Sequence, residues 1–343
     1  MTETEIIGNE YRKLFGNDDV KIAPLPKSGS DRKYFRVTSK KISVICTLNP
    51  VREENEAFIG FTRHFISKGL PVPEIYGYSP SENIYFQKDF GDINFFSWLK
   101  EEADKPDFRN NERTLYKKIL DSLVLFQTRG IDGLDLDLCY PHRSFDRQSM
   151  MWDMNYFKYM FLKLLAVPFN EPGLEADFSS LADYLLDERQ DYFLYRDFQS
   201  ANIMIAGGEP WFIDYQGGRK GAAQYDIASI LFDAKINMAG ETRDELFSYY
   251  CSRFCPVAGT DIGKFSERYY GFTMIRLMQA LGAFGFRGLY ENKPTFAESI
   301  VPGVSLLLEA AENMSRRIAL PELYKAIILV GQSPKYRELQ LRK

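Results

Sequence analysis

Short apolar runs separated by turn residues mark residues 1–90 as a small strand-rich region. We expect its strands at residues 20–25, 34–37, 42–46 and 84–86. Between the third and fourth of these segments, residues 53–68 carry apolar side chains at helical spacing, which predicts one amphipathic helix. A small antiparallel sheet accompanied by one helix is the expected structure.

The remainder of the chain shows helical periodicity over most of its length. Residues 112–128 carry an apolar stripe, at Leu115, Ile119, Leu123 and Phe126. Further helices are expected at residues 225–238, 241–254, 262–286, 297–315 and 320–330. The predicted fold class is therefore α+β, with an N-terminal sheet domain in residues 1–91 and a helical domain in residues 92–343.

Residues 194–214 interrupt the helical pattern with two short apolar runs that are flanked by polar residues. Asp197 is followed five residues later by Asn202, then by the two runs on either side of a glycine pair, and then by Asp214. The runs suit a β-hairpin, which would bring Asn202 at its start beside Asp214 at its end. Asp197, one loop upstream, would lie within reach of both.

Two carboxylates and an amide in this order are what phosphoryl transfer from ATP requires. Asp197 would orient the attacking hydroxyl and accept its proton, while Asn202 and Asp214 would bind Mg²⁺. An Asp and an Asn at this spacing also occur by chance in loops, so the hairpin that ends in Asp214 strengthens the prediction. Asp226, at the start of a predicted helix, could cap that helix or brace the catalytic loop.

A turn of small polar residues precedes the second predicted strand. Its backbone N–H groups could form a concavity for nucleotide phosphates, although an ordinary hairpin turn is the alternative. The residues of this turn are Ser28, Gly29, Ser30, Asp31 and Arg32.

The strand at residues 42–46 lacks the lysine that kinases use to bind phosphate. Lys33, Arg36 or Lys41 could supply the positive charge from a neighbouring position. Glutamates on the following helix, at positions 53, 54 and 56, have no obvious partner in the sequence.

The tripeptide Asp89-Phe90-Gly91 spells the metal loop of protein kinases, but it precedes Asp197 by more than 100 residues. A metal ligand should instead follow the catalytic Asp closely, as Asp214 does. We therefore assign residues 87–91, including Lys88 and Asp89, to a hinge that contacts the nucleotide. Asp92 would then cap the next helix or be a solvated polar residue.

These motifs resemble the aminoglycoside phosphotransferase family, a branch of the protein-kinase-like fold. The resemblance spans residues 20–315 and implies a two-lobed fold, ATP and Mg²⁺ as cofactors, and a small-molecule hydroxyl as acceptor. Tyr195 stands where the family usually has a histidine. Segments 30–36, 88–92, 212–216 and 277–282 are similar to the bacterial kinases that phosphorylate N-acetylmuramate and N-acetylglucosamine at the anomeric hydroxyl.

The aromatic-rich segment at residues 151–157 contains one acid, Asp153. Aromatic faces beside a carboxylate suit a sugar or a cationic amine, so we expect Asp153 to face the acceptor. Arg287 could meet an anionic group of the acceptor. The alternatives are that the aromatic residues pack into the core and that Arg287 is a surface residue.

Composition limits the partners of this 343-residue chain. Its net charge of −4 argues against a nucleic-acid surface. Because no apolar run is long enough to span a membrane and the N-terminus does not read as a signal peptide, we expect a cytoplasmic protein. With four cysteines and two histidines, free buried thiols are favoured over a zinc site.

The sequence therefore predicts an ATP- and Mg²⁺-dependent kinase that phosphorylates a hydroxyl of a small molecule, an amino sugar of the N-acetylmuramate or N-acetylglucosamine type. One alternative is a pseudokinase-like module that binds nucleotide or sugar without catalysis. Another is a kinase of a different alcohol, such as an aminoglycoside, choline or homoserine. A protein kinase is disfavoured because no long activation loop separates Asp214 from Asp226.

Overall fold

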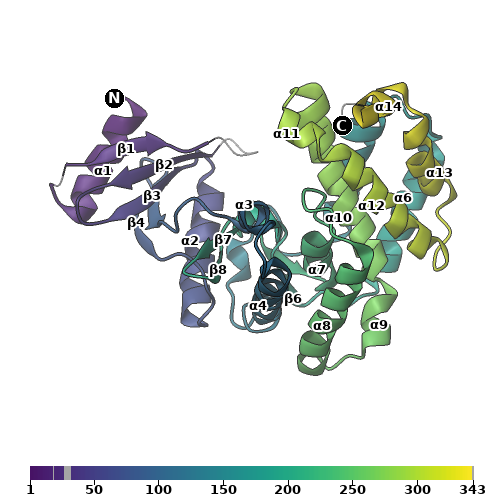
Figure 1. Cartoon of the computed structure of the whole chain (residues 1–343), viewed down its shortest axis with the longest axis horizontal. Coiled ribbons are helices and arrows are strands. Elements are labelled where there is room, and N and C mark those ends of the chain that lie inside the picture. Colours follow the sequence, from purple (N-terminus) through teal and green to yellow (C-terminus); the bar gives the residue numbers. More distant parts are fainter. Residues whose placement is uncertain (18, 27–31, 342–343) are drawn as a thin grey trace. The chain divides into compact units, whose positions relative to one another are not determined.

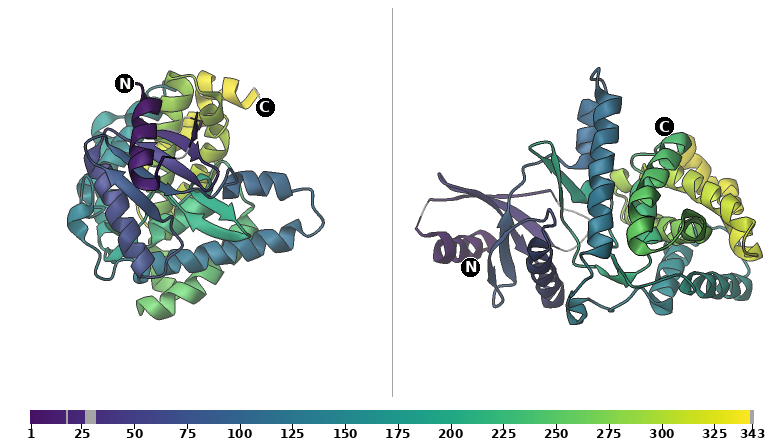
Figure 2. Two further views of the ribbon diagram at one scale, coloured as in Figure 1. Left: turned by 90° about the vertical axis from the view of Figure 1, so that its left-hand side faces the viewer. Right: turned by 90° about the horizontal axis from the view of Figure 1, so that it is seen from below.

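The computed structural model describes residues 1–17, 19–26 and 32–341 (Figures 1 and 2). Contacts along the chain group the residues into two compact units. The first unit comprises Met1–Arg143 and Ala201–Arg219, and the second comprises Ser144–Ser200 and Lys220–Lys343. The domain boundary expected between residues 91 and 92 stays a prediction.

A five-stranded antiparallel sheet is the main element of the first unit (Figure 1). Across the sheet the order is β1 (Lys21–Pro24), β2 (Lys33–Thr38), β3 (Ser43–Leu48), β5 (Ile84–Lys88) and β4 (Ile75–Ser79). The four expected strands are thus confirmed, and β4 was missed. The residues of β4 are all half-buried, so they lack the alternation that marks a strand with one face in the core.

Helix α1 (Glu3–Phe15) packs Ile7 and Tyr11 into the core of this sheet. Sequence analysis did not predict α1, although its N-terminus carries a recognisable signal. The Thr2 side chain accepts the backbone N–H of Glu5, and the Glu5 side chain accepts that of Thr2, which is a capping box.

Helix α2 (Arg52–Ser67) confirms the helix expected at residues 53–68. Its buried face carries Phe58, which stacks on Tyr85 of β5 with ring centroids 5.1 Å apart and on Tyr215 with centroids 4.7 Å apart. Burial of aromatic side chains on both sides fixes the helix against the sheet and against the segment that follows residue 214. Glu54 lies in the first turn of α2.

The rest of the first unit consists of α3 (Phe95–Glu102), α4 (Phe108–Thr128), η1 (Leu136–Leu138) and the hairpin of β7 (Ile203–Ala206) and β8 (Glu209–Phe212). The hairpin packs against both α3 and α4 (Figure 2). Gly207 and Gly208 form its turn with positive φ angles of 61° and 76°. The expected hairpin and the helix at residues 112–128 are confirmed.

Helix α3 is capped by Asn94 and not by Asp92, so of the two roles considered for Asp92 the structure shows a solvated polar residue. The Asn94 side chain accepts the backbone N–H of Ser97 at 2.9 Å. The Asp92 side chain is 77% exposed and pairs with Arg36 at 2.8 Å.

The second unit is mainly helical. Its elements are α5 (Arg147–Phe157), η2 (Lys158–Leu162), α6 (Glu171–Leu186), β6 (Tyr192–Leu194), α7 (Gln224–Leu231), α8 (Gly240–Ala258), α9 (Ile262–Glu267), α10 (Tyr269–Phe284), η4 (Gly285–Tyr290), α11 (Pro294–Ala297), α12 (Ile300–Ser315), α13 (Pro321–Leu329), η5 (Val330–Gln332) and α14 (Pro334–Leu341). Two short elements, η3 (Ser200–Asn202) and β9 (Arg219–Gly221), span points where the chain passes between units.

Helix α10 is the centre of this unit and packs against α5, α7 and α12. Where α10 ends and η4 begins, Gly285 lies close to η2. A Cβ atom at Gly285 would be 1.8 Å from the carbonyl oxygen of Met160, so the two elements can approach this closely only with glycine there. The single helix expected at residues 262–286 is two helices, because Arg268 leaves helical geometry with φ −105° and ψ 1°. The helix expected at 225–238 ends at Leu231, whereas α8, α12 and α13 confirm the other three.

All four cysteines are buried and free, as expected. Among the helices of the described residues, none combines the length and apolar character needed to cross a membrane.

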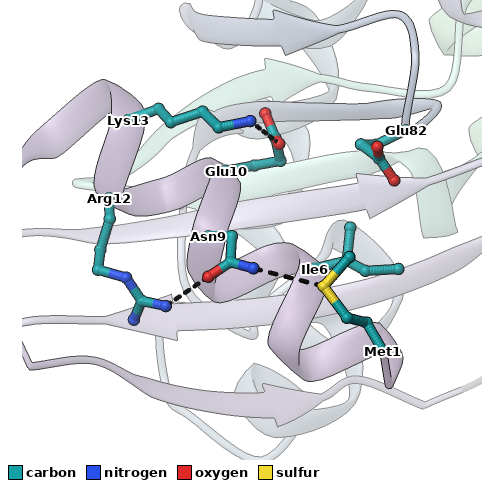
Figure 3. A pocket seen from close by; sticks show the side chains of 7 residues that line it. All are labelled: Met1, Ile6, Asn9, Glu10, Arg12, Lys13 and Glu82. Atoms are coloured by element: carbon teal, nitrogen blue, oxygen red, sulfur yellow. Dashed lines mark hydrogen bonds and ion pairs between the residues drawn. The ribbon is translucent and has the colours of Figure 1, made fainter.

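A surface hollow of about 330 Å³ lies beside α1 in the first unit (Figure 3). Its polar side chains pair with one another: Lys13 with Glu10 at 2.5 Å, and Arg12 with Asn9 at 2.6 Å. The Lys13–Glu10 pair thus joins two of the four charged side chains that line the hollow, the others being Arg12 and Glu82.

Candidate functional site

The first unit contains a larger cavity, of about 540 Å³. Apolar wall residues come from the sheet, from α2 and from the hairpin: Leu25, Ile45, Phe58, Met204 and Ile213. Among the residues predicted from sequence to form the site, five line the cavity: Arg32, Lys88, Asp89, Asn202 and Asp214. Ser28, Gly29, Ser30 and Asp31 lie outside the described residues.

The β7–β8 hairpin brings Asn202 beside Asp214, the arrangement that the two apolar runs predicted. The Asn202 Nδ2 atom lies 3.3 Å from Asp214 Oδ2, and the Asn202 carbonyl accepts the N–H of Ile213 at 3.1 Å. Asp214 has a φ of 70°, a left-handed conformation that costs energy for a residue other than glycine. The surrounding contacts therefore hold this carboxylate in a conformation that an isolated chain would avoid.

Arg32 connects Asp214 to helix α2. Its Nη1 atom lies 2.5 Å from Asp214 Oδ1, and its Nε atom lies 3.3 Å from Glu54 Oε2. The Arg32 side chain is 13% exposed, and burial by itself would lower its pKa. The negative potential of Asp214, Tyr34 and Glu54 outweighs burial and raises the pKa of Arg32, so the guanidinium stays charged.

Of the three basic side chains that we considered as substitutes for the strand lysine, Lys33 and Arg36 pair with other residues, and the role of Lys41 stays a prediction. Lys33 pairs with Glu3 of α1. Arg36 donates from Nε and Nη2 to the two oxygens of Asp89, at 2.7 and 3.1 Å.

Asp89 is held at the hinge by several donors. Besides Arg36, it accepts the Ser43 hydroxyl at 2.6 Å and the backbone N–H of Gly91 at 2.9 Å. Burial alone would raise the pKa of Asp89, but these hydrogen bonds together lower it, so the carboxylate is ionised. Neighbouring Lys88 places Nζ 5.0 Å from the ring centroid of Trp211.

Two residues of this site, Gln216 and Glu54, were not predicted from the sequence. Gln216 donates from Nε2 to Asp214 Oδ1 at 2.7 Å, and its position two residues after Asp214 was the available signal. Glu54 was noted without a partner, because Arg32 and α2 are separated by the second and third strands.

In the second unit, Asp197 follows β6 in a loop that is held by Asp226 of α7. The Asp226 carboxylate accepts the backbone N–H groups of Tyr195 at 2.7 Å and Arg196 at 3.0 Å. Burial raises the pKa of Asp226 to about 7 despite these hydrogen bonds. Of the two roles considered for Asp226, the structure shows it bracing the loop, and α7 has no side-chain cap.

Arg196 in the same loop forms a bidentate ion pair with Asp153 of α5. Its Nη1 and Nη2 atoms each lie 2.6 Å from one Asp153 oxygen, and Nη1 also donates to the Tyr225 hydroxyl at 2.8 Å. Burial would lower the pKa of Arg196, but the Asp153 carboxylate raises it. Arg196 has a φ of 81°, so its backbone is strained as that of Asp214 is.

The roles in acceptor binding that we expected for Asp153 and Arg287 stay predictions. Both carboxylate oxygens of Asp153 are occupied by Arg196, and the side chain is 8% exposed. Arg287 lies in η4, where its Nη1 atom is 2.8 Å from both oxygens of Glu291.

A family model described as the phosphotransferase enzyme family matches residues 21–262, more than half of the chain. The chain belongs to this phosphotransferase family. It is 26% identical over 317 residues to the N-acetylmuramate/N-acetylglucosamine kinase of Neisseria meningitidis serogroup B, with 88% of each chain covered. The family predicted from the sequence is confirmed.

Solved structures of related proteins share the fold. A putative aminoglycoside phosphotransferase from Ralstonia eutropha superposes with a TM-score of 0.62 at 12% identity, covering 96% of this chain and 99% of that one. A thermostable mutant of another aminoglycoside phosphotransferase, solved with ADP and hygromycin B, gives 0.52 at 15% identity, covering 88% and 97%. The predicted two-lobed protein-kinase-like fold is thus confirmed, and the protein is a small-molecule kinase that transfers phosphate to a hydroxyl.

Proposed function

We propose that this phosphotransferase transfers the γ-phosphoryl group of ATP to a hydroxyl of an amino sugar of the N-acetylmuramate or N-acetylglucosamine type, with Mg²⁺ as cofactor. The observation that carries the proposal is the pairing of Asn202 with Asp214 on the wall of the first unit's cavity, next to the cation Arg32. The amino-sugar acceptor is supported by the Neisseria kinase, which is similar to this protein over 88% of both chains.

The cavity has the volume and lining of a nucleotide site. Its volume of about 540 Å³ falls within the usual range for small-molecule pockets. Ile45, Met204 and Ile213 offer apolar surface to a base, and residues 88–91 of the predicted hinge also line the cavity. Arg32 provides the positive charge that phosphates require. ADP in the solved aminoglycoside phosphotransferase supports ATP as the phosphoryl donor.

The residues at the hairpin fit a magnesium ion. Mg²⁺ is usually bound in proteins through one or two carboxylates, while phosphate oxygens and waters complete its coordination. Asp214 supplies a carboxylate, and a half-turn of the Asn202 amide would present its oxygen beside it. The described residues contain no group of three or more His, Cys, Asp or Glu side chains that could hold a metal ion. When bound, the ion neutralises charge on the phosphate oxygens.

Asp197 is the proposed general base. The acceptor hydroxyl oxygen forms a bond to the γ-phosphorus, the bond from that phosphorus to the bridging oxygen of ADP breaks, and Asp197 takes the hydroxyl proton. The hydrogen bonds from Tyr195 and Arg196 to Asp226 hold the backbone just before Asp197, which limits the movement of this base.

An acceptor panel tests the proposal. The purified protein is incubated with ATP, Mg²⁺ and, separately, N-acetylglucosamine, N-acetylmuramate, an aminoglycoside, choline and homoserine, and phosphorylated products are detected by mass. We expect product with the amino sugars, and a loss of about 10²- to 10⁴-fold in kcat for Asp197→Asn with ADP affinity retained. Phosphorylation of choline alone would overturn the amino-sugar assignment. ADP binding without consumption of ATP on any acceptor would favour a non-catalytic module.

A further inference from the structure

The contact between Arg32 and Asp214 occupies the carboxylate that we assign to the metal. Asp214 Oδ1 lies 2.5 Å from Arg32 Nη1 and 2.7 Å from Gln216 Nε2, while Oδ2 lies 3.3 Å from Asn202 Nδ2. Both oxygens therefore face N–H donors. A divalent cation on Oδ1 would meet the charge of Arg32 at close range, so the ion and the guanidinium compete for this atom.

A second carboxylate supports Arg32 from another direction. The Arg32 Nε atom lies 3.3 Å from Glu54 Oε2, an ion pair without hydrogen-bond geometry, and the same Glu54 oxygen accepts Asn49 Nδ2 at 3.0 Å. Loss of the Asp214 contact would thus leave the guanidinium beside Glu54 and still charged. The planar group presents several donors, a geometry that suits phosphate oxygens as well as carboxylates.

The Asp214 carboxylate is the more accessible member of the pair, since the Arg32 side chain is 13% exposed. The Asp214 side chain is 30% exposed, and both residues line the cavity. A ligand in the cavity can therefore reach the pair without unfolding the wall around it.

We propose that Arg32 is an exchangeable internal cation. In the nucleotide-free protein it neutralises Asp214, and when nucleotide binds it moves to the phosphates while Glu54 retains its Nε contact. Asp214 is then released to the metal, so that a divalent cation binds well only together with nucleotide. This inference rests on the proposed function, and it explains how the protein manages without a lysine on β3.

Substitution of Arg32 should affect two ligands in opposite directions. We measure Mn²⁺ binding without nucleotide and ADP binding in EDTA, for the wild type and for Arg32→Gln. Loss of the competing charge should tighten Mn²⁺ binding about fivefold to tenfold, whereas loss of a charge-assisted contact to phosphate should weaken ADP binding about tenfold or more. A residue that merely maintains the wall would weaken both or change neither.

Lys33→Gln is the matched control, because it removes a positive charge from the next residue, whose partner is Glu3 outside the cavity. It should change each affinity by less than about twofold. Arg32→Lys, which keeps the charge and loses the planar fork, should give an intermediate ADP affinity.

Asp214→Asn provides a test that leaves Arg32 intact. Because the guanidinium no longer has to leave a carboxylate, ADP affinity in EDTA should rise about twofold to fivefold. Unchanged ADP affinity in this variant, or unchanged Mn²⁺ affinity in folded Arg32→Gln, would overturn the exchange. Turnover by the wild type separates this inference from the proposed function. If the wild type phosphorylates amino sugars but either affinity is unchanged, only the exchange of Arg32 is ruled out. If both affinities shift as expected but no amino sugar is phosphorylated, only the acceptor assignment is ruled out.

Discussion

Two arginine–aspartate pairs, one in each unit, consist of the same residue types in different surroundings. Arg32 and Asp214 share a single short contact, and the Asp214 side chain is 30% exposed beside a cavity. Arg196 and Asp153 share two contacts of 2.6 Å, and the Asp153 side chain is 8% exposed. The arginines are similarly buried, at 13% exposure for Arg32 and 17% for Arg196, so the two pairs differ in the exposure of the acid and in the number of contacts. We therefore expect the pair with the more exposed acid and the single contact to exchange partners more readily.

The surroundings of each arginine reinforce this distinction. Arg196 also donates to the Tyr225 hydroxyl and lies 4.9 Å from the centroid of the Phe145 ring, so its guanidinium has two further partners besides Asp153. Arg32 instead has a second carboxylate, Glu54, and faces open volume. The first arrangement orders the loop that precedes Asp197, and the second leaves a charge available to a ligand.

The largest effect is expected from removing the acid of the exposed pair. Asp214→Ala should reduce kcat about a thousandfold, because a metal ligand contributes several kcal/mol to phosphoryl transfer. The dependence of ADP affinity on Mg²⁺ should disappear, while thermal stability changes little. Kinetics and binding with and without Mg²⁺ measure these effects. Glu209→Ala, on the same hairpin and paired with Lys118, is the control. An unchanged response of ADP affinity to Mg²⁺ would exclude Asp214 as a metal ligand.

Removing the acid of the buried pair should reduce stability. Asp153→Ala leaves Arg196 as an uncompensated buried charge, so the free energy of unfolding should fall by about 3–5 kcal/mol in denaturant titrations. The double variant Asp153→Leu with Arg196→Met should recover most of this loss, since it removes both charges. Equal instability of the single and double variants would contradict a simple paired-charge account. Asp183→Ala, which breaks an exposed pair with Arg147, is the control.

The same double variant tests the acceptor role predicted for Asp153. If Asp153 contacts the sugar, the KM for the sugar should rise far more than the KM for ATP. Equal changes in both KM values would indicate that Asp153 acts through the loop that it holds.

The hairpin illustrates what could be predicted from the sequence. Two apolar runs, a glycine pair and flanking polar residues are all local, and they were sufficient to place Asn202 beside Asp214. The contact of Arg32 with Asp214 joins residues 182 positions apart, so no local pattern contains it. Asp153 was expected to face the acceptor because its sequence neighbours are aromatic, whereas the direction of its carboxylate depends on Arg196 in a distant loop.

Helix boundaries, too, could not be predicted fully from local sequence patterns. Apolar periodicity continues through Arg268, so residues 262–286 look like one helix, and the break there depends on tertiary contacts. Arg268 donates from Nε to the carbonyl oxygen of Tyr184 on α6 at 2.9 Å. Such contacts between distant segments are invisible to a pattern of apolar positions.

Asp226 is a third buried or half-buried acid in addition to Asp153 and Asp214, and its hydrogen-bond partners are backbone N–H groups and not an arginine. Its pKa of about 7 in the folded protein exceeds the value near 4 of an unfolded chain, so the folded state holds the extra proton between these values. The stabilisation is fully present below about pH 4 and is lost as pH rises towards 7, at up to about 1.4 kcal/mol per pH unit.

Denaturant titrations between pH 4.5 and 6.5 measure this slope for the wild type and for Asp226→Asn, which cannot titrate. We expect the free energy of unfolding of the wild type to fall more steeply with pH than that of the variant. Parallel curves would show that Asp226 is already ionised throughout this interval, with the two backbone hydrogen bonds compensating its burial.

The smallest effect is expected where a cation faces aromatic rings. Lys88 Nζ lies 5.0 Å from the Trp211 ring centroid and 5.5 Å from that of Phe90, and the two rings are stacked 4.6 Å apart. Lys88→Met keeps most of the packing of the stem and loses the charge, so the free energy of unfolding should fall by about 0.5–1 kcal/mol.

Lys100→Met is the matched control, because Lys100 Nζ lies 4.4 Å from the Phe96 centroid and does not line the cavity. Similar small losses of stability in both variants would place Lys88 below either arginine pair in energetic importance. ADP affinity then separates the two lysines: it should fall in Lys88→Met alone if the hinge lysine contacts the nucleotide. Equal ADP affinities in the two variants would remove Lys88 from the nucleotide site and leave Arg32 as the cation that the cavity offers to phosphate.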